Sequence, residues 1–370
     1  MLFCGAALVI AVAAYFVVPR IFSVAYNRAD ADVASSDGKP STPSKPLVLD
    51  TVAYDSKLLA LANNPLPKVA TISTSAASGS KAATVATAST TATVPKPTLW
   101  PVHAAYPIAG ALLPFNRIVA YYGNFYSKGM GVLGQYPPDE MIRRLTAEVA
   151  KWNAADPTTP VIPAIDYIAV TAQGSPGAAG KYRLRMPDSQ IDMALALAEK
   201  VHGIVFLEIQ PGLSTFQTEI PQLEKYLKMP QVHLSLDPEF SMKSGAKPGT
   251  EIGTISAADV NWTAQYLANL VRTNNLPPKI LVVHRFTMPM VTNYKSIVPL
   301  PEVQVVIDMD GWGSPAKKIG TYTNIVAKQP VQFTGFKLFY KNDLRAPSTR
   351  MLTTADILKL TPQPSFIQYQ

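Results

Sequence analysis

Short apolar runs recur along the chain from residue 117 to the end, and most of them finish in a polar or acidic residue. Each run is five to nine residues long, which is the usual length of a buried strand. Seven segments long enough for a helix separate them. Eight strands that alternate with helices predict a (β/α)8 TIM barrel. The runs are Arg117–Phe125, Val161–Tyr167, Ile204–Pro211, Val232–Phe240, Lys279–Phe286, Val303–Gly311, Phe333–Tyr340 and Ser365–Tyr369.

The polar residues that close these runs are the candidate site. In a barrel of this kind the functional side chains lie at the C-terminal ends of the strands. Because residues two apart share one face of a strand, polar residues that alternate with apolar ones should point into the barrel mouth. The strand ends carry Tyr122, Asn124, Asp166, Glu208, Gln210, Asp237, Glu239, His284, Asp308, Asp310 and Lys337.

The connections between the runs contain helix and loop signals. Prolines and acids at Pro137–Glu140 suit the first turn of a helix. Ser256–Asp259 has the spacing of a capping box, with Asp in place of Glu. The long segments Gln173–Pro187 and Ser241–Thr254 are rich in glycine and lysine or arginine, and loops of this length are often lids or binding loops.

The first hundred residues differ in character from the rest. Residues 1–28 contain a charge-free apolar stretch that predicts a transmembrane or signal-anchor segment, with a cleavage motif ending at Ala25. Its usual basic leader is missing, which suggests a start site upstream. Residues 29–100 are rich in Ser, Thr, Ala and Pro and predict a flexible linker. A more apolar island within it, Pro46–Ala62, is a candidate to pack on the barrel or on envelope material. The barrel itself is predicted to occupy 101–370.

Composition excludes several classes of protein. The formal net charge is +8, but the charges are scattered, which argues against nucleic-acid binding. The single cysteine, Cys4, excludes an internal disulfide. The chain has only four histidines and no HExxH helix, so no dedicated metal site or cofactor is predicted, although a divalent cation can bind carboxylates.

Asp237-Pro238-Glu239 is the sharpest chemical signal. Two carboxyl groups two residues apart crowd each other, which raises one pKa and leaves the other low, and glycoside hydrolysis uses such a pair. We therefore predict Glu239 as the general acid and Asp237 or Glu208 as the base or nucleophile. The structural alternatives are that Asp237 caps the turn at Pro238 and that Glu208 forms an ion pair with Lys337 or His284.

The remaining candidates would hold a hydroxyl-rich substrate. Carboxylates and amides bind hydroxyl groups, and an exposed tryptophan can stack on a sugar ring. An alternative role for the acids is to bind Mg²⁺, Mn²⁺ or Ca²⁺ through oxygen ligands. The predicted substrate-binding residues are Tyr122, Asn124, Gln210, His284, Asp308, Asp310, Trp312 and Lys337.

Four segments also resemble a family of uncharacterised secreted TIM-barrel proteins of actinobacteria and related bacteria. They are Ala120–Gly123, Leu236–Glu239, Val283–Phe286 and Gly335–Tyr340. The resemblance covers about residues 117–370 and implies a glycosidase-like barrel, without established catalytic residues. Asp237-x-Glu239 is also similar to the Asp-x-Glu of chitinase-like and lysozyme-like barrels, although the longer acidic signature of chitinases is absent.

These observations predict an exported barrel, tethered at the extracytoplasmic face of the cell membrane or secreted after cleavage. It would act on cell-envelope or extracellular carbohydrate by carboxylate acid/base catalysis. A divalent-metal-dependent hydrolase or lyase with the same carboxylates is the second hypothesis. A non-catalytic glycan-binding barrel is the third.

Overall fold

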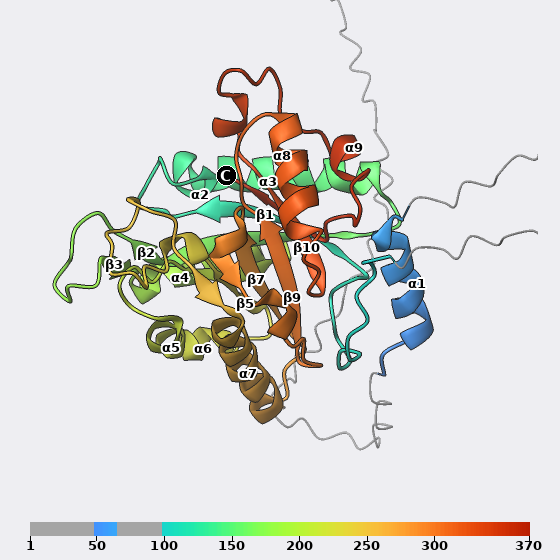
Figure 1. Ribbon diagram of the computed structural model, residues 1–370, viewed down its shortest axis with the longest axis horizontal. Coiled ribbons are helices and arrows are strands. Elements are labelled where there is room, and N and C mark those ends of the chain that lie inside the picture. Colours follow the sequence, from blue (N-terminus) through green and yellow to red (C-terminus); the bar gives the residue numbers. More distant parts are fainter. Residues whose placement is uncertain (1–47, 65–97) are drawn as a thin grey trace, which may run out of the picture. The chain divides into compact units, whose positions relative to one another are not determined.

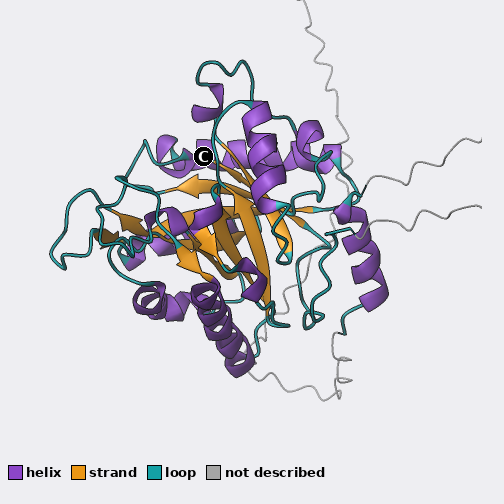
Figure 2. Ribbon diagram, in the orientation of Figure 1, coloured by secondary structure: helices purple, strands orange, loops and turns teal. Residues whose placement is uncertain are grey.

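The computed structural model describes residues 48–64 and 98–370, and its centre is a closed barrel of parallel strands (Figure 2). Strand β1 pairs with both β2 and β11, which closes the ring, and the full order is β1-β11-β10-β9-β7-β5-β4-β2. The predicted (β/α)8 architecture is confirmed. The barrel strands are β1 (Arg117–Gly123), β2 (Val161–Ala172), β4 (Ile204–Ile209), β5 (Val232–Leu236), β7 (Lys279–Arg285), β9 (Val303–Met309), β10 (Phe333–Leu338) and β11 (Phe366–Tyr369).

Helices surround the strands (Figure 1). The predicted start at Pro138 and the predicted capping box of Ser256 and Asp259 are both present. The helices around the barrel are α2 (Val132–Gln135), α3 (Pro138–Ala155), α4 (Asp188–Glu199), α5 (Phe216–Glu219), α6 (Glu224–Leu227), α7 (Ala257–Asn274), α8 (Pro315–Thr321) and α9 (Thr354–Ile357). A π-helical turn, η5 (Tyr322–Val326), extends α8.

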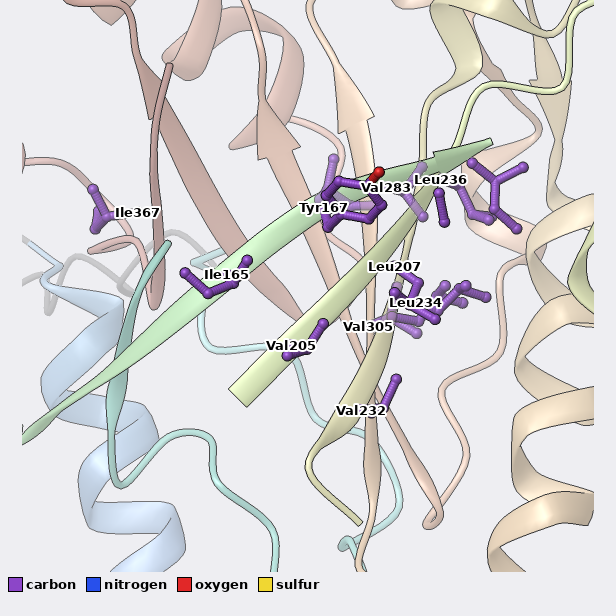
Figure 3. Close-up of a cluster of buried hydrophobic side chains, with 14 of the residues drawn as sticks. Ile165, Tyr167, Val205, Leu207, Val232, Leu234, Leu236, Val283, Val305 and Ile367 are labelled. Carbon is purple, nitrogen blue, oxygen red and sulfur yellow. The ribbon is translucent and has the colours of Figure 1, made fainter. Parts of the chain in front are cut away.

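Outward-facing strand residues form the main core. Figure 3 shows Ile165, Tyr167, Val205, Leu207 and Leu234 on neighbouring strands of this layer. Alternation along each strand directs these side chains towards the helices, where their apolar surface is removed from water. The opposite faces of the same strands therefore point into the barrel.

The barrel interior changes from apolar to polar along its axis. The part nearer the N-terminal ends of the strands, here called the lower part, holds a separate apolar cluster that includes Ala120, Phe206, Val282 and Phe366. The residues two positions further along these strands are polar, namely Tyr122, Glu208, His284 and Gln368. The C-terminal end of the barrel therefore gathers the polar groups that form the candidate site.

The lower end is closed by the chain that precedes β1. Leu113 is fully buried there, and its backbone exchanges two hydrogen bonds with Gln304, at 3.1 and 2.6 Å. Helix α1 (Thr51–Ala62) packs Tyr54 into the same apolar cluster. Because α1 lies inside the stretch assigned to the linker, that assignment does not apply to residues 48–64.

Two expectations about local structure are wrong. Strand β5 ends at Leu236, and the predicted strand to Phe240 is interrupted by a 3₁₀ turn, η2 (Pro238–Phe240), because proline cannot donate to the strand ladder. The connection from β7 to β9 contains no α-helix in the described chain. Prolines at 289, 299 and 301 divide it into η3 (Met288–Met290), η4 (Tyr294–Ser296) and β8 (Val291–Thr292), which pairs with β6 (Ile255–Ser256).

The predicted lid at Gln173–Pro187 is held in place by ion pairs. It contains β3 (Arg183–Arg185), which runs antiparallel to β2. Glu219 is fully buried and accepts hydrogen bonds from Arg183 at 2.8 Å, Arg185 at 2.7 Å and Ser214 at 2.5 Å. This loop is therefore fastened to the connection that follows β4.

The predicted membrane segment, residues 1–28, lies outside the described residues. Across 48–64 and 98–370, no helix has both the length and the apolar character that crossing a bilayer requires.

Candidate active site

The strand ends bring nearly all the predicted site residues into one buried group. We call Tyr122, Asp166, Glu208, Gln210, Asp237, His284, Asp308, Asp310, Lys337 and Gln368 the mouth cluster, and each is at most 8% exposed. It contains five carboxyl groups but only two basic side chains, His284 and Lys337. Like charges in a buried site cannot all be ionised, so some of these carboxyls must keep a proton.

Glu208 is the hydrogen-bonding centre of the mouth cluster. One carboxylate oxygen accepts from the Tyr122 hydroxyl at 2.8 Å and from Gln210 Nε2 at 3.2 Å, and the other lies 2.9 Å from His284 Nε2. Burial would raise the pKa of Glu208, but the charge and hydrogen bond of His284 outweigh it and lower that pKa. Glu208 is therefore an ionised carboxylate.

His284 lies between two carboxyl groups. Its Nδ1 is 3.0 Å from Asp308 Oδ2, on the side opposite Glu208. Burial alone would lower the pKa of His284, but Glu208 and Asp308 raise it well above its ordinary value, so the ring is an imidazolium. The space for Asp308 depends on Gly335, since a side chain at that position would overlap the Asp308 carboxyl.

Lys337 forms the second charged pair. Its ammonium group lies 3.0 Å from Asp310 Oδ1 and 3.7 Å from the centre of the Tyr122 ring. Burial lowers the pKa of Lys337, but the surrounding carboxylates, Asp310 first, raise it above its ordinary value. Lys337 is thus a fixed cation and unsuited to act as a neutral amine nucleophile.

Asp237 has the structural role that the sequence offered as an alternative, because it caps the turn at Pro238. One oxygen caps the η2 turn by accepting from the backbone N–H of Glu239 at 3.0 Å, and the other accepts from Gln210 at 3.2 Å. Burial, followed by the charges of Glu208 and Glu239, raises the pKa of Asp237 well above its ordinary value. Asp237 therefore holds its proton and is a poorer base than Glu208.

Glu239 lies at the edge of the mouth cluster and is partly exposed. Its position on the η2 turn, rather than on β5, directs it away from the strand ladder. Burial and the charge of Asp310 raise the pKa of Glu239 to about 7. Within the described chain, its carboxyl forms no side-chain hydrogen bond, so it is available to an incoming molecule.

Asp166 belongs to the mouth cluster although its sequence position alone gave it no role. It accepts from Gln368 at 2.6 Å and from Ser235 at 3.2 Å, and burial together with the charge of Glu208 raises its pKa to about 8. Gln368 was not predicted. Its place between the buried Phe366 and the end of β11 is the alternation signal that would have revealed it.

Asp166, Glu208 and His284 are also the residues that could hold a metal. Each offers one ligand atom, and the three atoms lie within 4.8 Å of one another. Both ring nitrogens of His284 are engaged by carboxylates, so a cation would have to replace the proton between His284 and Glu208. The three side chains therefore suit a protonated His284 better than a bound metal ion.

Two predicted site residues lie apart from the mouth cluster. Asn124 is buried, and its side chain bonds to Ile168 O at 3.1 Å and Tyr126 N at 2.9 Å, which is a structural role. Trp312 is 43% exposed on the loop after β9. It is therefore accessible to a ligand, whereas Asn124 is not.

Comparisons with known proteins give only remote likenesses. No family model and no curated protein matches the chain. Among solved structures, a broad-specificity endoglucanase from Clostridium longisporum is 12% identical, covering 60% of this chain and 75% of its own, with a TM-score of 0.34. A Bacillus subtilis mannanase is 12% identical over 69% and 79% of the two chains, with a TM-score of 0.37. A sugar phosphate isomerase/epimerase from Parabacteroides distasonis is 8% identical over 73% and 90%, at 0.30. These values are too low to argue from, and the class of the protein, a (β/α)8 barrel with a carboxylate-rich mouth, rests on its own strand pairing.

Proposed function

We propose that this protein is a glycoside-hydrolase-like enzyme that cleaves carbohydrate by carboxylate acid/base catalysis. The observation that carries the proposal is the contrast between two nearby carboxyl groups at the C-terminal end of the barrel. Glu239 is accessible and has a pKa of about 7, whereas the buried Glu208 is held ionised by His284. Environments that push two carboxyl pKa values apart define an acid and a base.

In this mechanism Glu239 donates a proton to the glycosidic oxygen as the bond to the sugar breaks. The positive charge that develops on the sugar ring is stabilised by the negative Glu208, and a water molecule then adds to the sugar carbon and returns its proton to Glu239. Gln210 Nε2 is shared between Tyr122, Glu208 and Asp237, each at 3.2 Å. Since no single one of these bonds is short, substrate hydroxyls can replace them and open the way to Glu208.

The test is hydrolysis of bacterial cell-wall and storage glycans by the full-length chain, with and without EDTA, beside Glu239→Gln. We expect turnover that survives EDTA and falls at least about 10²-fold in the variant, the usual contribution of a general acid. Loss of turnover in EDTA would instead support the metal-dependent hypothesis at Asp166, Glu208 and His284. Binding without any turnover would support the non-catalytic one.

The cellular site is a separate part of the proposal. The apolar residues 2–18 and the Ser/Thr-rich stretch support export and membrane tethering, as does the resemblance to secreted actinobacterial proteins. Cell fractionation of the full chain and of a chain lacking residues 1–28 tests this. Tethering predicts that the full chain sediments with membranes, and recovery of both forms in the same soluble fraction would contradict it.

A further inference from the structure

An aromatic side chain and two cations lie together outside the mouth cluster. The Trp312 ring is approached by Lys317 Nζ at 4.9 Å and by the Arg345 guanidinium carbon at 5.3 Å. Trp312 lies on the connection from β9 to α8 and Lys317 lies in the first turn of α8, whereas Arg345 follows β10 and the turn η6 (Asn342–Leu344). All three side chains are exposed.

Neither cation has an acidic partner in the described chain. The nearby acid, Asp343, is fully engaged. It binds Lys318 at 2.7 Å, and it accepts from the backbone N–H groups of Gly313 and Phe339, both at 3.0 Å. These bonds join the loop after β9 to the loop after β10, so the loop that carries Trp312 is held in place. We call Trp312, Lys317 and Arg345 the platform.

The charges on the platform favour an anion. Since both cations lie within 5.3 Å of one ring centre, they are about 10 Å apart at most, and like charges at that distance repel. A carboxylate or phosphate between them would relieve this repulsion, and arginine binds such groups with two parallel hydrogen bonds. An exposed indole ring with two cations held over it thus matches a sugar that carries an acidic substituent.

The platform is close to the mouth cluster along the chain, because Trp312 is two residues beyond Asp310. The mouth cluster itself is rich in carboxyl groups and would repel an anion. An acidic sugar residue would therefore lie outward on the platform and place its neighbour, with the bond to be cut, at Glu239. We propose that the substrate is an acidic glycan and that the platform binds its anionic residue, an inference that rests on the proposed function for the position of the cut.

The experiment compares binding of three probes to the full-length Glu239→Gln chain, which keeps the ligand intact. The probes are an oligogalacturonate, a neutral cello-oligosaccharide and a phosphate-bearing teichoic acid fragment. Calorimetry at low and high salt measures the affinities. We expect at least one anionic probe to bind at least tenfold more tightly than the neutral one, with a preference that shrinks in high salt. The two anionic probes distinguish a carboxylate from a phosphate ligand.

Variants of the platform locate the effect. We expect Lys317→Gln with Arg345→Gln to weaken the anionic probe at least tenfold and the neutral one less than twofold. Trp312→Ala should weaken both probes. Lys359→Gln, an exposed lysine beyond α9, is the matched control and should change neither.

The outcomes separate this inference from the proposed function. Equal affinity for neutral and anionic probes, no binding of any probe, or an unchanged anionic affinity in the double variant would overturn the acidic-glycan inference, even if neutral glycans are hydrolysed. Selective binding that depends on the platform would uphold it, even if the wild-type chain shows no turnover. In that second case only the hydrolase proposal would fail.

Discussion

At the scale of single residues, the raised pKa of Glu239 makes the stability of the fold depend on pH. Its pKa rises from an ordinary 4.5 to about 7 on folding, so between those values the folded state binds more protons than the unfolded state. Stability from this group is therefore complete below about pH 4.5 and is lost as the pH rises through 7. At about 1.4 kcal/mol per pKa unit, this shift corresponds to a loss of the order of 3 kcal/mol.

Glu239→Gln should remove this loss, because glutamine stays neutral. Thermal melts from pH 4.5 to 8 are expected to show a smaller fall in Tm for the variant than for the wild type. A residual fall belongs to the other carboxyl groups with raised pKa values, which are Asp166 at about 8, Asp237 and Asp308. Parallel curves for the two chains would contradict the raised pKa of Glu239.

The pair of Lys337 and Asp310 is the second test at this scale. Lys337→Met would leave Asp310 buried without its partner, and breaking a buried ion pair from one side costs about 3–5 kcal/mol. The double change Lys337→Met with Asp310→Leu should recover much of that loss in urea denaturation. A double variant as unstable as the sum of the two single ones would show that the pair is not coupled.

At the scale of elements, alternation along the strands was sufficient to predict most of the site. Glu208, His284 and Asp308 were placed on inward faces because they alternate with apolar residues that face the helices. Their mutual contacts could not be predicted, since these depend on the stagger between three strands far apart in sequence. Register pairs His284 with Asp308 across β7 and β9, and no local pattern encodes it.

Prolines made the predicted strand or helix wrong in two places. Pro238 ends β5 early, which moves Glu239 onto a turn and exposes its carboxyl. The prolines between β7 and β9 replace a helix with short turns. Asp166 and Gln368 were missed as a pair because they lie near opposite ends of the barrel sequence and meet through the strands that close the ring.

The fastening of the β2–α4 loop gives a prediction for one element. Glu219→Gln would weaken the bonds to Arg183 and Arg185 and is expected to cost about 1–3 kcal/mol, the range for a buried charged hydrogen bond. Hydrogen exchange should quicken most within residues 173–187. Glu140→Gln is the control, since its exposed pairs with Arg143 and Arg144 should contribute under about 1 kcal/mol. Equal effects of the two changes would refute the fastening role.

At the scale of the whole described chain, the two ends of the barrel have separate tasks. The C-terminal end carries the mouth cluster, whereas α1 and the chain before β1 seal the other end. Helix α1 is held by Lys57, which donates to Thr158 O at 2.7 Å, and by Leu61, whose carbonyl accepts from Gln363 at 2.7 Å. Closing this end of the barrel therefore requires residues that lie far before its first strand in the sequence.

Tyr54→Ala tests this division of tasks. Tyr54 is 4% exposed and lies edge-on against Phe115, with ring centres 6.0 Å apart, so its removal leaves a cavity and should cost about 3 kcal/mol. Leu59→Ala, at a position 63% exposed on the same helix, should cost under about 0.5 kcal/mol. Because the seal lies at the end opposite the mouth cluster, we expect Tyr54→Ala to lower Tm while the pH profile and Michaelis constant of glycan hydrolysis stay unchanged at temperatures where the variant is folded. A shifted pH profile would mean that the seal also sets the electrostatics of the mouth cluster, and an unchanged Tm would mean that α1 does not close the barrel in solution.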